Sequence, residues 1–189
     1  MILRTLIIAL LFSIYSASFA SESQSPVIAR LGKIVVEIPT EFGVANRTFP
    51  NKQSILDVYV SRKDLPPTLI QLNRIVVPEA QVSANEKDRY DGIPDLLLGF
   101  LRTFSKNVVG WSRSSIEPIR LGGYIAAKSK WSGSYHGVPT TGVMYLVVIG
   151  KESFFLHAFG RDDVPNKPLT SAIKAIEHMS VDLLSTRLD

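Results

Sequence analysis

Apolar and polar residues alternate along several segments of the chain, which predicts β-strands with one buried face. In the first half these segments are Leu31–Pro39, Ile55–Arg62 and Leu69–Val77. Between the first two, Phe42–Ser54 is interrupted by Gly, Asn and Pro residues and is predicted to be a loop. The polar stretch Glu79–Asp91 is predicted to be an exposed loop as well.

The second half has the strongest strand signals. Ile119–Trp131 alternates, Gly133–Pro139 is predicted to turn the chain, and Val143–Ile149 is apolar without a break. An unbroken apolar run is typical of a central strand that is covered on both faces. Gly150-Lys151 then predicts a tight hairpin turn that leads back into Ser153–Phe159.

Two segments have helical periodicity instead. The first follows Pro94, a residue that suits a first helical turn, and is predicted to stop at Gly110. Its apolar residues at helical spacing are Leu97, Leu101, Phe104 and Val108. The second, near the C-terminus, has Leu169, Ala172, Ile173 and Ile176 on one side.

Short connections between successive strands predict antiparallel pairing. With one two-sided apolar strand and two strong helices, the sequence predicts an α+β fold. We expect an antiparallel sheet of about six strands flanked by helices on both faces, an α/β/α sandwich. A length of 189 residues favours one folded domain, predicted to span residues 21–189.

Residues 1–20 have the pattern of a secretory signal peptide. One early cation, Arg4, precedes the nine-residue apolar run Leu6–Ile14, and small residues follow up to a cleavage site predicted near Ala20. Crossing a bilayer takes ~20 apolar residues, so this run is too short for an anchor. Because no later segment approaches that length, we expect an exported protein, placed in the bacterial periplasm, without a membrane span.

Charge and cysteine content exclude several classes of function. Removing residues 1–20 leaves 20 Lys and Arg against 17 Asp and Glu, a net charge of +3 without clustering. Nucleic-acid recognition needs clustered cations or a reading motif, so we expect no nucleic-acid partner. The absence of cysteine excludes disulfide scaffolds, thiol nucleophiles and thiolate metal sites.

No catalytic, metal or cofactor site is predicted. His136, His157 and His178 have no metal-binding spacing, and His157, between two Phe residues on one strand face, is interpreted as a core histidine. Gly110-Trp-Ser-Arg-Ser114 lacks the last glycine of a nucleophile elbow. Asp88-Arg-Tyr-Asp-Gly92 has too few acidic residues for a calcium loop.

One surface is a candidate for partner binding. Trp131, Tyr135 and His136 cluster at a predicted hairpin end, and Lys128 and Lys130 lie on the strand that leads into it. Aromatic side chains beside cations are enriched at interface hot spots, although Trp131 could instead close the core of the sheet. The lysines favour an acidic protein partner.

Three stretches resemble the PsbP-like family: Ile34–Gly43, Gly122–Ala127, and the Val143–Phe159 hairpin with the helix Leu169–Met179 that follows. Proteins of that family have an antiparallel sheet between helices. They occur as photosystem accessory proteins, as a Ran-binding nuclear-transport factor and as exported bacterial proteins. The resemblance implies a scaffold for binding proteins or ligands and implies no catalytic residues.

Two classes of function follow as hypotheses. The first is an exported, non-enzymatic accessory module that binds another protein. A variant of it, suggested by a resemblance to small periplasmic immunity proteins, is neutralisation of a secreted toxin. The second class is a small-ligand carrier or hydrolase with a site between sheet and helix.

Overall fold

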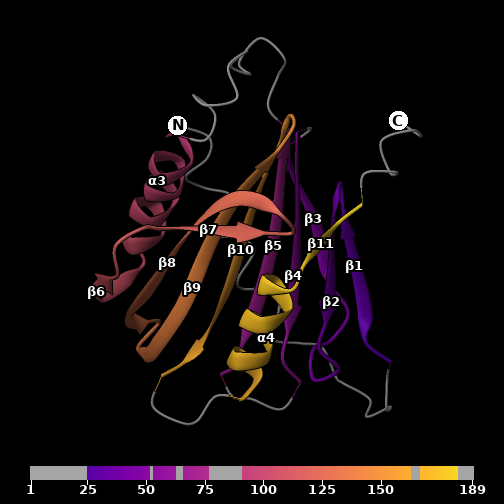
Figure 1. Cartoon of the computed structure of the whole chain (residues 1–189). Coiled ribbons are helices and arrows are strands. Elements are labelled where there is room, and N and C mark those ends of the chain that lie inside the picture. Colours follow the sequence, from indigo (N-terminus) through magenta and orange to yellow (C-terminus); the bar gives the residue numbers. More distant parts are fainter. Residues whose placement is uncertain (1–24, 52, 63–65, 77–90, 163–166, 183–189) are drawn as a thin grey trace.

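The structure is a computed structural model that describes residues 25–51, 53–62, 66–76, 91–162 and 167–182 (Figure 1). The predicted signal peptide, its cleavage site and nearly all of the predicted loop Glu79–Asp91 lie outside these residues. The described strands are β1 (Val27–Leu31), β2 (Ile34–Ile38), β3 (Asn46–Asn51), β4 (Ser54–Val60), β5 (Leu69–Val76), β6 (Val108–Arg113), β7 (Glu117–Leu121), β8 (Tyr124–Tyr135), β9 (Val138–Ile149), β10 (Glu152–Arg161) and β11 (Ser180–Val181). The described helices are α3 (Ile93–Ser105) and α4 (Lys167–Glu177).

The fold is mostly β, so the expected α/β/α sandwich around a six-stranded sheet is wrong. The described strands form two sheets. The large one has eight strands in the order β3-β4-β5-β10-β9-β8-β6, with β7 also paired to β8, and the small one has three, β1-β2-β11. All of the pairings are antiparallel.

The missed strands explain the error in strand number. β3 falls in the predicted loop Phe42–Ser54, and it is an edge strand, where Pro and Asn are tolerated because no partner needs the outer N–H groups. Gly122 and Gly123, with φ of 55° and 89°, form a tight turn that divides the expected strand Ile119–Trp131 into β7 and β8. The Gly-Gly pair is a local turn signal that was overlooked, whereas no local pattern marks β3.

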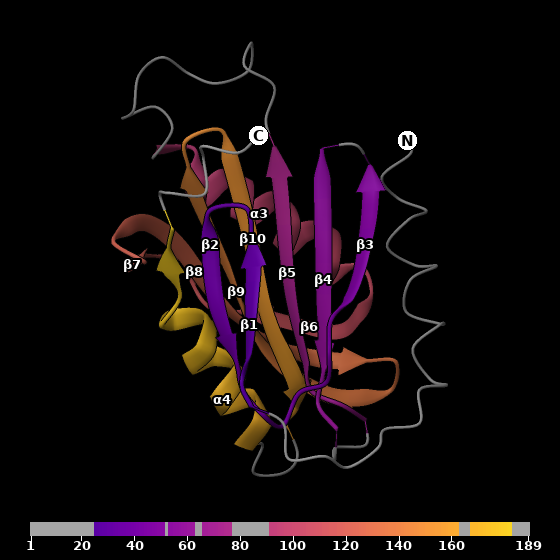
Figure 2. The ribbon, with the colours of Figure 1, turned by 90° about the vertical axis from the view of Figure 1, so that its right-hand side faces the viewer.

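The large sheet is covered on both faces. On one face, Ile93, Leu97 and Leu101 of α3 pack against the sheet, which confirms a helix that begins near Pro94. Its predicted extension to Gly110 is wrong, because α3 ends at Ser105, and Val108 and Gly110 belong to the edge strand β6. α4 and the small sheet lie on the other face. In Figure 2, β1 and β2 stand in front of the large sheet, and β3 and β4 extend beyond them. The small sheet thus takes part of the position expected for helices.

The centre of the large sheet is the most deeply buried part of the described chain. Nine of the ten residues of β10, Glu152–Gly160, are buried. In the neighbouring β9, Val143–Val147 are all buried, which confirms the prediction of a strand covered on both faces. α4 packs Leu169, Ala172 and Ile176 into the core that the large sheet shares with β1 and β2.

Candidate functional site

The predicted partner-binding residues are divided between the two faces of β8. Lys128 pairs with Tyr145 and Lys130 with Val143 of β9, which places both lysines on the side that carries α4. Trp131, one residue further along the strand, packs on the opposite side. The five residues therefore do not form one continuous surface.

On the α4 side, the two lysines differ in their surroundings. Lys128 Nζ lies 3.8 Å from Glu177 Oε1, and the same carboxylate oxygen accepts a 3.0 Å hydrogen bond from the Tyr145 hydroxyl. Burial and the adjacent Glu177 carboxylate raise the pKa of Tyr145 above its ordinary range. Lys130 is exposed. Its charge, unlike that of Lys128, is therefore available to a partner.

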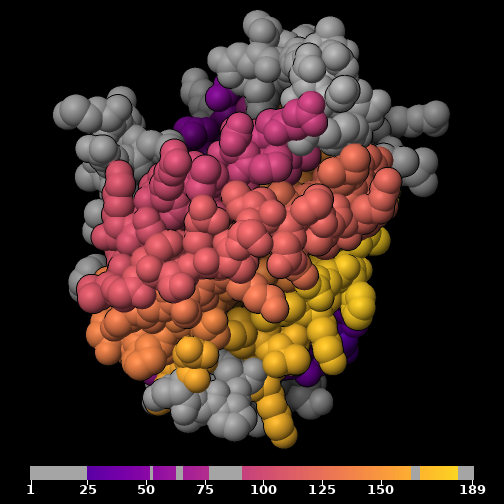
Figure 3. Space-filling model, turned by 60° about the vertical axis from the view of Figure 1, so that its left-hand side comes forward, coloured from indigo at the N-terminus to yellow at the C-terminus, as the bar shows by residue number. Residues whose placement is uncertain are grey.

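Small hydroxyl residues lie beyond Lys130 toward the hairpin tip on this side of the sheet. By strand register, Ser132 and Thr141 are opposite each other, and Ser134 lies two residues beyond Ser132. We call the surface of Lys128, Lys130, Ser132, Ser134 and Thr141 the lysine face. Figure 3 shows the neighbouring end of the molecule, where the tip of the β8–β9 hairpin (orange, lower left) and α4 (yellow, lower right) both reach the surface.

The hairpin tip is shorter than the predicted turn Gly133–Pro139. Only His136 and Gly137 lie between β8 and β9, both with positive φ, 50° and 81°. His136 is exposed, whereas Tyr135 is partly buried and its ring stacks on Phe104 at a centroid distance of 5.7 Å. Burial also raises the pKa of Tyr135.

Trp131 belongs to the core. It is 2% exposed, and its ring lies at centroid distances of 5.0 Å from Phe104 and 5.2 Å from Trp111. Its Nε1–H donates a 2.9 Å hydrogen bond to His157 Nε2. Of the two interpretations open from the sequence, the structure supports the one in which Trp131 closes the core of the sheet.

His157 is a core histidine, as predicted. Because its Nε2 accepts from Trp131, its Nδ1 carries the proton and faces Gln71 Oε1 at 3.4 Å. Burial lowers the pKa of His157 to about 3. The ring is therefore neutral at physiological pH. Its unprotonated nitrogen, Nε2, already accepts the hydrogen bond from Trp131.

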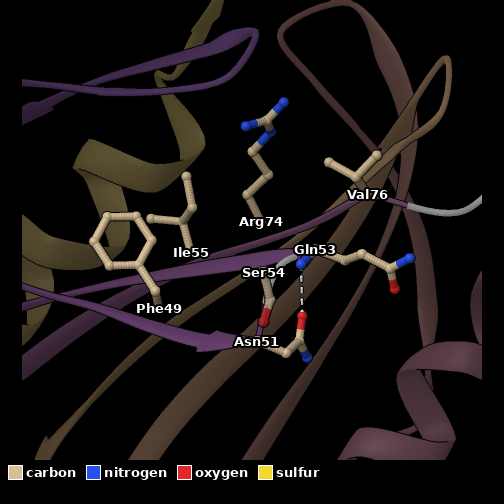
Figure 4. A pocket seen from close by; sticks show the side chains of 7 residues that line it. All are labelled: Phe49, Asn51, Gln53, Ser54, Ile55, Arg74 and Val76. Carbon is tan, nitrogen blue, oxygen red and sulfur yellow. Dashed lines mark hydrogen bonds between the residues drawn. The ribbon is translucent and has the colours of Figure 1, made fainter.

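A separate hollow lies at the far end of the large sheet, where β3 meets β4 and β5 (Figure 4). Its volume is about 490 Å³. Phe49, Ile55, Val76 and Arg74 point to the same side in Figure 4, toward the β1–β2 hairpin. We call it the Phe49 hollow, and its lining residues are Phe49, Asn51, Gln53, Ser54, Ile55, Arg74 and Val76.

Two buried acids beside this end of the sheet are paired with arginines. Arg74 bonds Glu152 through Nε, at 2.6 Å, and through Nη2. Arg47 holds both oxygens of the fully buried Asp57 at 2.7 Å and also donates to the Arg30 carbonyl of β1 at 3.3 Å. Arg47 thus links β3 and β4 of the large sheet to β1 of the small sheet, whereas Arg74 and Glu152 join β5 to β10 within the large sheet.

Within the part of the chain that the structure describes, the buried atoms Ser54 Oγ, Asn73 Oδ1 and Glu152 Oε2 have no hydrogen-bond partner. None of these residues was predicted from the sequence to be buried and polar. The signal for Asn73 was present, because Gln71 and Asn73 alternate with Ile70 and Leu72 in β5, which predicts polar side chains on one side of this strand.

The described residues contain no group of three or more acidic or histidine side chains arranged to hold a metal ion. Within the same ranges, no helix combines the length and apolarity needed to cross a membrane.

Comparison with known proteins identifies a shared fold. No family model and no curated protein matches the chain, so the PsbP-like resemblance stays a prediction. The chain is similar to LpqN, described as involved in cell envelope biogenesis of Mycobacterium tuberculosis. The identity is 21% and the TM-score 0.55, over 84% of this chain and 90% of LpqN. At this identity the similarity shows the fold alone.

Two further solved structures are less similar. A Bacteroides thetaiotaomicron protein has 9% identity and a TM-score of 0.46, over 78% of this chain and 44% of its own length. A Pseudomonas aeruginosa protein of unknown function, PA94, has 13% identity and a TM-score of 0.41, over 73% of this chain and 84% of its own.

Proposed function

We propose that this chain is an exported, non-enzymatic accessory module of the cell envelope that binds an acidic protein through its lysine face. The observation that carries the proposal is the arrangement around Lys130. The exposed cation of Lys130 lies beside short hydroxyl side chains of β8 and β9, and the neighbouring Lys128 is neutralised by Glu177 of α4.

The chemistry of this face suits a protein surface. Ser and Thr hydroxyls both donate and accept hydrogen bonds, and short side chains lose little conformational freedom when they are covered. Lys130 adds one positive charge that is not paired within the described residues. Such a charge accelerates association with an acidic partner and makes it sensitive to salt.

Two observations support the envelope location. Residues 1–20 have the signal-peptide pattern, and the fold is shared with a protein described as involved in cell envelope biogenesis.

Site-directed photocrosslinking in living cells tests the proposal. A photoreactive residue at Ser132 is expected to give one discrete protein adduct, and the same residue at Lys106, exposed on the α3 side, is expected to give none. Lys130→Glu should abolish the adduct, and Lys106→Glu should leave it intact. Absence of an adduct at Ser132, or an adduct that Lys130→Glu does not reduce, would contradict the proposal.

The identity of the crosslinked protein then separates the accessory role from immunity. A secreted toxin in the adduct indicates neutralisation, whereas a resident envelope protein indicates an accessory role. High salt should slow formation of the adduct in either case, because both depend on the charge of Lys130.

A further inference from the structure

The Phe49 hollow combines an exposed aromatic ring with apolar walls. Phe49 is 68% exposed. Burying an aromatic side chain removes about 150–250 Å² of its surface from water, so a ligand that covered Phe49 would bury apolar surface. Ile55 and Val76 line the hollow beside it. The volume of about 490 Å³ falls within the range of about 300–1,000 Å³ that small-molecule sites occupy.

Arg74 is the charged residue among those that line the hollow. Arg74 uses Nε and Nη2 to bind Glu152 Oε1. Its Nη1 donates to no residue within the described ranges. The backbone of Gly32 packs against the guanidinium, since a Cβ there would lie 2.6 Å from Arg74 Nε. The guanidinium is therefore held in place, with Nη1 donors to offer and no acceptor.

The charges of this site balance each other. Glu152, on the neighbouring strand β10, is 7% exposed and neutralises Arg74. Binding a second carboxylate at Arg74 would place two like charges around one guanidinium. A neutral carbonyl oxygen can accept from Nη1 without that repulsion.

We propose that the Phe49 hollow binds a small, uncharged amphiphile, with its apolar body against Phe49, Ile55 and Val76 and its carbonyl oxygen on Arg74. Asn51 and Gln53, exposed at the rim, offer amide groups to any further polar atoms of the ligand. This binding site is independent of the lysine face, because β3 and β8 lie on opposite sides of the central strands β10 and β9.

Strand addition by a peptide is less well supported by the same region. On β3 the register shifts between Thr48 and Asn51, and Pro50 lacks an N–H. The Arg30 carbonyl of β1 already accepts a bond from Arg47. Neither edge offers an uninterrupted ladder to an extended chain.

The probe for this test is 6-propionyl-2-(dimethylamino)naphthalene, an uncharged fluorophore with an aromatic body and one carbonyl, whose emission shifts to shorter wavelength on leaving water. We expect saturable binding with a blue shift. Phe49→Ser should weaken binding at least tenfold, and Val109→Ser, which replaces a 78% exposed valine on the far edge strand β6, should not change it.

The role of Arg74 is tested with Arg74→Lys, which keeps the charge that faces Glu152 but removes Nη1. This variant should weaken binding of the carbonyl probe and leave unchanged the binding of N-phenyl-1-naphthylamine, an apolar fluorophore without a carbonyl. Methyl octanoate should displace the probe more effectively than octanoate. Thermal unfolding of each variant verifies that it is folded.

Three results would overturn the proposal: no saturable shift with the wild-type protein, equal losses in Phe49→Ser and Val109→Ser, or stronger competition by octanoate than by its ester. Lys130→Glu should leave probe binding unchanged. A failure of the protein-partner proposal is therefore distinguishable from a failure of this one.

Discussion

Acid should destabilise the protein through His157 in particular. Its side chain is buried, and burial lowers its pKa to about 3 in the folded protein, whereas the ordinary pKa of histidine is 6.5. Between these two values the unfolded chain binds a proton that the folded protein excludes. The free energy of unfolding therefore rises with pH in this interval and loses its dependence on His157 above pH 6.5.

The magnitude follows from the width of the interval. At 1.36 kcal/mol per pH unit, stability lost through His157 amounts to about 3 kcal/mol on going from pH 6.5 to pH 4, and about 5 kcal/mol by pH 3. Domains have a total stability of about 5–15 kcal/mol, so this loss is a large share of the total.

The variant His157→Gln isolates this effect. Glutamine does not titrate, and its carbonyl can still accept the hydrogen bond that Trp131 Nε1 donates to His157. We expect the variant to cost about 1–3 kcal/mol at pH 7, where it alters a packed and hydrogen-bonded site, and to lose less stability than the wild type as the pH falls.

Urea unfolding followed by tryptophan fluorescence at pH 7, 6, 5 and 4 measures both effects. His178→Gln, at an exposed histidine just after α4, is the matched control and should retain the wild-type acid dependence. If the curves of wild type and His157→Gln run parallel from pH 7 to pH 4, the reasoning about His157 is refuted.

Three further predictions concern packing, ion pairing and alkaline pH. Gly142→Ala should lower the free energy of unfolding by about 1–3 kcal/mol, because the added Cβ would lie 2.7 Å from both Phe159 Cβ and Trp131 Nε1. The control Gly99→Ala adds a Cβ in open space on a helix and should raise the free energy of unfolding by about 0.5–1 kcal/mol. Thermal unfolding measures both changes. Arg47→Ala should destabilise by about 2–3 kcal/mol in urea unfolding, since it leaves Asp57 buried and unpaired, whereas a loss below 0.5 kcal/mol would contradict that role. Burial and the Asp57 charge raise the pKa of Tyr59 from 10 to about 12, so stability should fall as pH rises above 10, and Tyr59→Phe should reduce that fall in unfolding curves measured from pH 9 to pH 11.5.

Much of the fold could be predicted from local pattern. Both described helices and the strands β4, β5, β9 and β10 were found, because their periodicity depends only on which face is buried. The core position of His157 was predicted for the same reason, from the Phe residues on either side of it along β10.

The strand β2 was also predicted, within Leu31–Pro39, but the edge strands and the partners of β2 in the second sheet were not. β3 and β6 have irregular registers with their neighbours and few buried residues, so no apolar period marks them. β1 pairs with β2 through the turn Gly32-Lys33, and its short alternation of buried and exposed residues was missed. β11 is two residues long, so its pairing with β2, far away in the sequence, and not a sequence pattern defines it.

The candidate sites show the same division. The sequence by itself determined that Lys128 and Lys130 share one strand face and that Trp131 lies on the other, because side chains of a strand alternate. Only the tertiary structure decided that Glu177 of α4 neutralises one of these lysines and that Trp131 is buried. The Phe49 hollow likewise exists only in the tertiary structure. The physical reason is that burial and charge pairing depend on contacts between residues far apart in the sequence, such as Arg74 and Glu152.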